Sequence, residues 1–212
     1  MTEPITILYA DAAIVVVEKA AGFLAVPGRG ADKQDCVEAR IRALFPHSPG
    51  QPAAHRLDMD TSGLMVLALT AAAHRHLSRQ FAERLVEKQY LAVVEGVVAA
   101  ECGTIELAFR LDPDNRPSQV YDPVQGKQGV SRWRKVAVEN GRSRIEFEPL
   151  TGRTHQLRLH AAHPLGLGCP IVGDRLYGRR QEGERMLLHA CRLCFRHPTT
   201  GAALCFSSAP PF

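Results

Sequence analysis

Several features of exported and membrane-bound proteins are missing from this chain of 212 residues. No apolar run approaches the roughly 20 residues that a membrane-spanning helix needs. The start, MTEPITILYADAAIVVVEK, has no basic segment ahead of an apolar one, so we expect no signal peptide. These absences predict a cytoplasmic protein that does not bind a membrane.

Cysteine is sparse, with six residues at positions 36, 102, 169, 191, 194 and 205. They are too few and too scattered for a disulfide framework at this length. Cys191 and Cys194 form a lone CxxC, and no second CxxC or nearby histidine pair completes the set of about four ligands that a zinc site needs. We therefore expect reduced, structural thiols.

Lysine is scarce as well: of the 26 basic residues only five are lysines, and 21 are arginines. Arginine binds phosphates bidentately and stacks on bases, which suits a nucleic-acid partner. Genomic base composition explains the same bias equally well, since the chain is also rich in alanine. The net charge of +4 is mild, so composition alone leaves the partner open.

The hydrophobic patterning predicts many strands and few helices in a chain of ordinary globular composition. Strand-like segments cover residues 5–8, 14–18, 64–69, 89–95, 103–107, 130–138, 142–149, 187–196 and 203–207. Helices are expected over 37–45, 71–86 and 156–162, with Thr70 as an N-cap and 112–129 as a loop. Strands in runs predict an α+β fold with a mostly antiparallel sheet.

The first segment with chemical potential is HRLDMDTSGL, residues 55–64, just before an apolar strand. It offers two acids, Asp58 and Asp60, with Arg56 and His55 beside them. The spacing does not fit a calcium loop, because no glycine or closing glutamate stands at the required positions. The acids either act chemically from a rigid scaffold or cap a turn, and the spacing leaves both possibilities open.

Two further segments carry polar groups. GRTHQLRLH, residues 152–160, is dense in arginine and histidine, which hold phosphates or ionise near neutrality. His155 and His160 are five residues apart, unlike the i, i+4 pairs of helical metal sites, so a metal is disfavoured. In Lys88-Gln-Tyr90, at the start of a strand, the tyrosine by itself fits sheet packing as well as function.

Taken together, HRLDMDTSGL, KQY and GRTHQLRLHAAHPLGLGCPIVGDRLYG resemble the RluA family of RNA pseudouridine synthases in order and spacing. The opening VVVEKAAGFLAVPG and the ending LLHACRLCFRHPTTG extend the resemblance over nearly the whole chain. RLDMDTSG and DNRPSQ are most similar to the founding RluA branch. One departure is Ala20, where the family often has proline.

The resemblance implies an isomerase that breaks the N1–C1′ bond of a uridine, rotates the uracil and rejoins it through C5. It implies no cofactor and no metal. It also implies one catalytic domain over residues 1–212, with the pseudouridine synthase fold: a mixed, mostly antiparallel sheet flanked by helices. We expect a monomer without the N-terminal S4-type RNA-binding module of some relatives.

The resemblance also assigns roles to residues. Asp58 matches the catalytic aspartate, which either stabilises or traps the sugar cation or removes the 2′ proton. Arg153 matches its cationic partner and Tyr90 the tyrosine that stacks on the target base. Asp60 is expected to structure the loop. The residues expected to contact RNA are Arg56, which would fill the place of the departed uridine, His55, Arg158 and Lys88.

The implied substrate is a stem-loop of tRNA, in the anticodon arm, or of large-subunit rRNA, or both. Another tRNA position is the alternative within the same chemistry. A metal-dependent hydrolase built on the histidine cluster and a non-catalytic RNA-binding module are the remote alternatives.

Overall fold

A computed structural model describes residues 5–179 and 184–212 of the chain. These residues form two compact units: one holds the described residues up to Lys88 and Ala190–Pro211, the other Gln89–His189 and Phe212. Both units are antiparallel sheets with helices, so the predicted α+β class is confirmed. None of the helices in the described part is long and apolar enough to cross a membrane.

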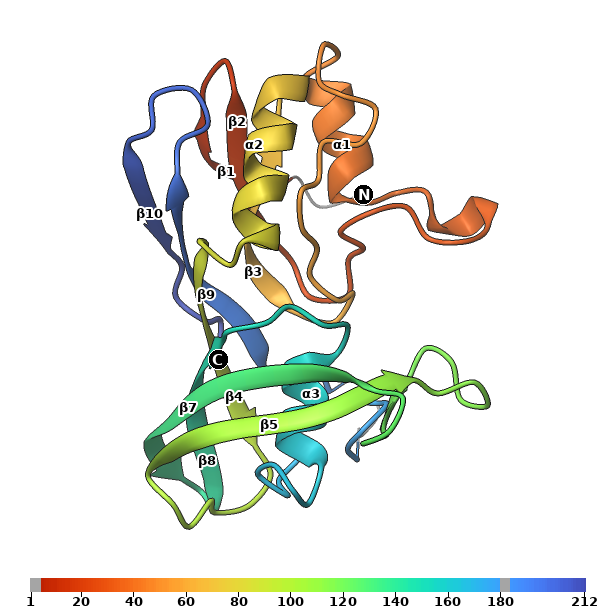
Figure 1. Cartoon of the computed structure of the whole chain (residues 1–212), viewed down its shortest axis with the longest axis vertical. Helices are drawn as coiled ribbons and strands as arrows, with labels where there is room; N and C mark the ends of the chain where they lie inside the picture. Colours follow the sequence, from red (N-terminus) through yellow and green to blue (C-terminus); the bar gives the residue numbers. More distant parts are fainter. Residues whose placement is uncertain (1–4, 180–183) are drawn as a thin grey trace. The chain divides into compact units, whose positions relative to one another are not determined.

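The first unit is built on the strand order β1-β2-β3-β9, with β10 paired to β9. The bounds are β1 Thr6–Ala10, β2 Ile14–Lys19, β3 Ser62–Ala68, β9 Leu188–Arg196 and β10 Ala203–Ser207, with the 3-10 helix η1 Ala31–Lys33 and the helices α1 Val37–Leu44 and α2 Ala71–Ala82. Every residue of β3 is buried, which is why its sequence is apolar without alternation. α2 packs on β3 (Figure 1) and buries Leu77 in the core of this unit.

The second unit has the strand order β4-β8-β7-β5-β6. The bounds are β4 Glu87–Val94, β5 Cys102–Leu111, β6 Gln119–Tyr121, β7 Lys127–Glu139, β8 Arg142–Pro149 and helix α3 Gln156–Ala162. α3 packs on β7 (Figure 1), and Leu157 and Leu159 join Phe147 in the core. The expected loop over 112–129 is partly wrong, because it contains β6 and the start of β7.

The helix boundaries follow local side-chain chemistry. Thr70 caps α2 as predicted, since its hydroxyl oxygen accepts a hydrogen bond from the backbone N–H of Ala73 at 3.1 Å. The predicted continuation of α2 to Val86 is wrong. Arg84 adopts a left-handed φ of 61°, which ends the helical path after Ala82 and leaves Leu85 61% exposed.

One cysteine pair contradicts the expectation that all thiols are reduced. β9 and β10 place Cys194 directly opposite Cys205, and the structure joins them in a disulfide with a Cα–Cα distance of 4.1 Å. The two cysteines are eleven residues apart in the sequence, and the register of the β9–β10 hairpin is what brings them together. Cys36, in contrast, is a buried free thiol, and its sulfur caps α1 at 3.4 Å from Ala39 N.

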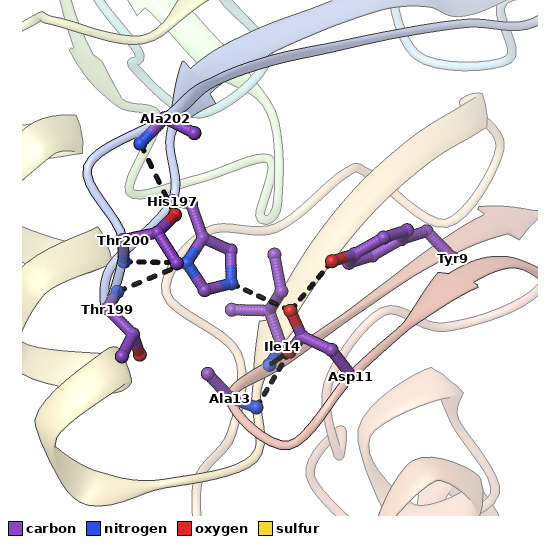
Figure 2. A network of polar contacts seen from close by, with 8 residues as sticks. All are labelled: Tyr9, Asp11, Ala13, Ile14, His197, Thr199, Thr200 and Ala202. Atoms are coloured by element: carbon purple, nitrogen blue, oxygen red, sulfur yellow. Dashed lines mark hydrogen bonds and ion pairs between the residues drawn. The ribbon is translucent and has the colours of Figure 1, made fainter.

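A partly buried polar network ties the β1–β2 turn to the β9–β10 turn within the first unit (Figure 2). The carboxylate of Asp11 accepts four hydrogen bonds of 2.7–2.9 Å, from Tyr9 Oη, His197 Nε2 and the backbone N–H groups of Ala13 and Ile14. Tyr9 and His197 reach the same carboxylate oxygen from opposite ends of the chain. Asp11 therefore joins segments that are 186 residues apart.

The histidine of this network is fully used by the fold. His197 Nδ1 accepts hydrogen bonds from the backbone N–H groups of Thr199 and Thr200 at 3.2 and 3.1 Å (Figure 2). Its proton must then sit on Nε2, which donates to Asp11. Because both ring nitrogens are occupied internally, the Asp11–His197 pair stabilises the fold and is not an acid–base pair for catalysis.

The Asp11 network predicts a specific loss of stability in acid. Burial raises the pKa of Asp11, but its four hydrogen bonds outweigh this and lower the pKa to about 2. The unfolded value is about 3.9, so the stabilisation is complete above about pH 4 and disappears as the pH falls from 4 to 2. The carboxylate is partly exposed, so we expect about 1–2 kcal/mol.

The measurement is the free energy of unfolding in urea at pH 5 and at pH 2.5, for the wild type and Asp11→Asn. The wild type should lose about 1–2 kcal/mol more than the variant over this interval, since the other carboxyl groups titrate in both proteins. Equal losses in the two proteins would show that Asp11 does not stabilise the fold through its charge.

Candidate active site

The HRLD segment lies in the first unit as an irregular loop that leads into β3. Asp58 is half-buried, and its backbone carbonyl accepts a hydrogen bond from Thr61 N at 3.1 Å, which closes a turn. Gly63 follows at a φ of 113°, and any side chain there would collide with the backbone of Ala190 in β9. The glycine of TSG is thus required by close strand packing just beyond the loop.

A buried lysine that the sequence analysis did not single out holds this loop. Lys19, only 1% exposed at the end of β2, donates from Nζ to three backbone carbonyls. The acceptors are Phe23 O at 2.6 Å, Ala20 O at 2.8 Å and Met59 O at 2.9 Å. Since Met59 stands between Asp58 and Asp60, the ammonium group fixes the backbone that carries both acids.

The pKa of Lys19 reflects both its burial and the acids of the loop. Burial lowers the pKa of Lys19 to about 7, and the charges of Asp58 and Asp60 act in the opposite direction. Three carbonyl acceptors match the three N–H donors of the protonated form, so the contacts themselves also favour the ammonium ion. The ammonium group of Lys19 therefore lies close to a loop with two carboxylates and holds its backbone.

His55 supports the loop from the side of β3 and α2. Its Nε2 accepts a hydrogen bond from Val66 N at 3.1 Å, and its ring stacks on Phe81 with centroids 4.4 Å apart. Burial, with a smaller effect of the Lys88 charge, lowers the pKa of His55 to about 3. The ring is therefore neutral at physiological pH and its contacts serve the loop. Contact of His55 with RNA stays a prediction.

The other predicted residues of the first unit differ in exposure. Arg56 is exposed, whereas Asp60 is buried with 9% exposed, which fits its expected role in structuring the loop. Lys88 is half-buried near His55, and burial lowers its pKa. Of the residues of the predicted site, four lie in the first unit: His55, Arg56, Asp58 and Lys88.

In the second unit, Arg153 lies on an exposed turn fixed by a buried glutamine. The Oε1 atom of Gln156 accepts hydrogen bonds from Thr151 Oγ1 at 2.6 Å and Arg153 N at 3.1 Å. Its Nε2 donates to Val130 O at 3.0 Å and Ser131 Oγ at 2.9 Å. Gln156 therefore sets the position of the Arg153 backbone, while the guanidinium reaches Gln128 O at 3.5 Å.

Tyr90 and Arg158 occupy contrasting places in this unit. Tyr90 is half-buried on β4, opposite Phe147 of β8, and packs against the edge of the core. Arg158, which was expected to contact RNA, is buried, and that contact stays a prediction. Its guanidinium is 3% exposed and forms two hydrogen bonds to Asp174 at 2.7 and 2.8 Å, so it belongs to a buried ion pair.

The histidines of the GRTHQLRLH region serve separate structural purposes. His155 contacts Tyr177 Oη at 2.9 Å through Nδ1, and His163 Nδ1 accepts from Leu165 N at 3.1 Å. His160 is fully buried against Phe109, and burial lowers its pKa to about 4. Within residues 5–179 and 184–212, no group of three potential metal ligands comes together.

The structure thus provides two prepared segments. One unit presents a half-buried carboxylate in a loop held by an internal cation, and such a group can attack or stabilise an electron-poor carbon or remove a proton. The other unit carries Arg153 on a turn whose backbone is fixed by a hydrogen bond to Gln156, and Tyr90 near the start of β4. Asp58 belongs to one unit and Arg153 to the other, so their pairing stays a prediction.

The comparisons with known proteins agree with this chemistry. Residues 13–163 match the family described as RNA pseudouridylate synthase. The chain is 42% identical to the dual-specificity RNA pseudouridine synthase RluA of Escherichia coli strain K12, over 98% of this chain and 94% of that protein. Identity to the RluA protein of Yersinia pestis is 40%, over 97% and 99% of the two chains.

A solved structure points the same way. Human RNA pseudouridylate synthase domain containing 1 aligns with 99% of this chain and 85% of its own, at a TM-score of 0.78 and 31% identity. The chain therefore belongs to the RNA pseudouridylate synthase family and is an isomerase. The predicted family, fold and enzyme class are confirmed, and its similar relatives include RluA proteins of several bacteria.

The role of Lys19 can be tested by Lys19→Met, which keeps a long apolar side chain and removes the three donors. Each buried carbonyl left without a donor costs about 1–3 kcal/mol, and relief of the buried charge offsets part of this. We expect a net loss of about 2–4 kcal/mol in the free energy of unfolding, measured in urea. Lys33→Met, at an exposed lysine of the same unit, is the control. Equal stability of the two variants would contradict the role of Lys19.

Proposed function

We propose that this enzyme isomerises uridines in stem-loops of two kinds of RNA, the anticodon arm of tRNA and a hairpin of large-subunit rRNA. The observation that carries the proposal is the identity of 40–42% over nearly the full length to relatives named as dual-specificity enzymes. Loop bases are already unpaired, so their extrusion costs less than extrusion from a helix. A hairpin therefore suits an enzyme that recognises RNA through its catalytic domain.

Asp58 is the proposed catalytic residue. It acts at the ribose while the N1–C1′ bond breaks, either by bonding to C1′ or by removing the 2′ proton. Both routes require a carboxylate in a fixed position, and Lys19 behind the loop holds the backbone next to Asp58 through Met59 O. The uracil then rotates and C5 bonds to C1′, while the Asp58–C1′ bond breaks or the 2′ proton is returned. C5 loses its proton and N1 takes up a proton, so the product is an isomer of the substrate.

Three further residues act around this step in the proposal. Arg153 supplies the positive charge that keeps Asp58 ionised, and its turn is preorganised by Gln156. Tyr90 stacks on the target uracil and assists removal of the C5 proton. Arg56, exposed beside the loop, fills the space that the extruded uridine leaves in the RNA, since a planar guanidinium stacks like a base.

The remaining proposals concern the whole protein. We place both compact units in one catalytic domain over residues 1–212, because the matched family region runs from one unit into the other. Lys88 and His55 border the RNA-binding surface in this scheme, with His55 chiefly supporting the loop. The enzyme works as a monomer in the cytoplasm, where its RNA substrates are, and it needs no metal or cofactor.

Asp58→Asn should abolish pseudouridine formation and leave RNA binding nearly unchanged. The amide has almost the same shape, but it can neither bond to C1′ nor take a proton. We expect turnover to fall by more than about a thousandfold, as for the loss of a catalytic nucleophile. The measurement is product analysis by mass spectrometry beside an equilibrium binding assay. Asp32→Asn, at an exposed acid of the same unit, is the control, and normal turnover by Asp58→Asn would refute the assignment.

An isolated stem-loop should be a sufficient substrate. We expect the anticodon arm and the rRNA hairpin to be modified at rates within about tenfold of the full-length RNAs, because loop bases can be splayed and stacked without tertiary structure. Arg56→Ala should reduce turnover on the stem-loop more than it reduces binding, whereas Arg75→Ala, at an exposed arginine of α2, should change neither. Modification of full-length tRNA alone would favour a different tRNA position instead.

A further inference from the structure

The loop between β5 and β6, residues 112–118, is highly organised although it is exposed. The carboxylate of Asp112 accepts hydrogen bonds from the backbone N–H groups of Asp114 and Asn115 and from Asn115 Nδ2, at 3.0–3.3 Å. Two backbone bonds of 2.8 and 2.9 Å, Ser118 N to Asn115 O and Asp112 N to Ser118 O, close the loop. The loop therefore holds its shape without burial, which is what a preorganised binding element requires.

The base of this loop is linked to the GRTH turn through one hydroxyl group. Tyr177 Oη accepts a hydrogen bond from Gln119 N at 2.6 Å and lies 2.9 Å from His155 Nδ1. His155 adopts a left-handed φ of 55° two residues after Arg153, and a tyrosine contact stabilises this unusual backbone. The β5–β6 loop and the Arg153 turn are thus fixed by the same side chain.

Tyr177 is itself held rigidly. Its backbone N–H donates to Asp174 Oδ1 at 3.2 Å, and its ring lies 5.3 Å from the guanidinium carbon of Arg158. Asp174 and Arg158 form the buried ion pair described above. This arrangement explains why Arg158 is buried: it positions a tyrosine that in turn positions an exposed loop.

Arg116 stands on the exposed part of the β5–β6 loop. In the described parts of the chain, no carboxylate pairs with it and no hydrogen bond from its guanidinium is formed. Arginines on the adjoining strands are paired, Arg110 with Asp122 at 2.6 Å and Arg134 with Glu146 at 2.7 Å. An unpaired guanidinium on a preorganised loop is suited to bind phosphate bidentately.

We infer that the β5–β6 loop is an RNA-binding element in which Arg116 binds a backbone phosphate away from the target nucleotide. Arg153 reaches Gln128 O, and Gln128 pairs with Ala108, three residues or about 10 Å along β5 from the end of that strand. The loop begins at this end of β5, so in the inference Arg116 contacts a phosphate other than that of the reacting uridine. This inference rests on the proposed function, because it assumes a stem-loop RNA as the ligand.

The test is the salt dependence of stem-loop binding, measured with the full chain carrying Asp58→Asn so that the RNA is not converted. Adding Arg116→Ala should weaken binding by about three- to tenfold and reduce the slope of log affinity against log salt by about 0.7. The matched control is Arg132→Ala, which removes a 62% exposed arginine from neighbouring β7 and should leave the slope unchanged. Equal slopes for these two variants would overturn the inference.

Two more variants test the loop itself. Tyr177→Phe keeps the ring over Arg158 but removes the hydroxyl group. It should therefore weaken RNA binding less in a chain that already carries Arg116→Ala than in the parent chain that keeps Arg116. Asp114→Asn removes an exposed acid of the same loop and should bind RNA more tightly, by about twofold. Weaker binding by Asp114→Asn, or additive effects of Tyr177→Phe and Arg116→Ala, would count against the loop as an RNA-binding element.

The proposed function is tested separately. If the wild-type chain forms no pseudouridine in either stem-loop, the proposed substrate is wrong whatever the binding slopes are. If the wild type modifies the stem-loop but Arg116→Ala binds it with unchanged affinity and slope, only the inference about the β5–β6 loop fails.

Discussion

The candidate active site depends on one buried ammonium group. The segment between Ala54 and Ser62 forms no helix or long strand, so most of its backbone carbonyls need donors from elsewhere. Lys19 donates to one of them, Met59 O, and to two carbonyls of residues 20–23, and Met59 O also accepts from Gly22 N at 2.9 Å. Met59 directly follows Asp58, so the contact that gives the loop its shape also fixes the backbone of the proposed catalytic residue.

In the second unit, a neutral glutamine and a buried ion pair hold exposed segments as Lys19 does in the first unit. Gln156 fixes the turn of Arg153, and the Arg158–Asp174 pair fixes Tyr177. In each case a buried polar side chain with complete hydrogen bonding holds an exposed segment in a defined geometry. Such preorganisation reduces the ordering cost when RNA binds, because the loops already have their bound shape.

Most of the fold could be predicted from the sequence, because buried helices and strands place apolar residues at regular spacings along the chain. The limits of α3 and β10 were predicted correctly, but the end of α2 was not, since a single left-handed residue decides it. For the site, a motif led to the proposals for Asp58 and Arg153, and these stay predictions. Lys19 and Gln156 were missed because several of their partners are backbone groups, which every residue has. The ion pair of Arg158 was missed because its partner is sixteen residues away.

The central claim is that this enzyme converts loop uridines of both a tRNA and large-subunit rRNA. The most direct measurement is pseudouridine mapping of total RNA from cells with and without the gene. The account predicts that pseudouridine disappears from one position in an anticodon arm and from one position in an rRNA hairpin, and that both return with the wild-type gene but not with Asp58→Asn. Identical maps with and without the gene, or loss confined to a tRNA stem, would contradict it.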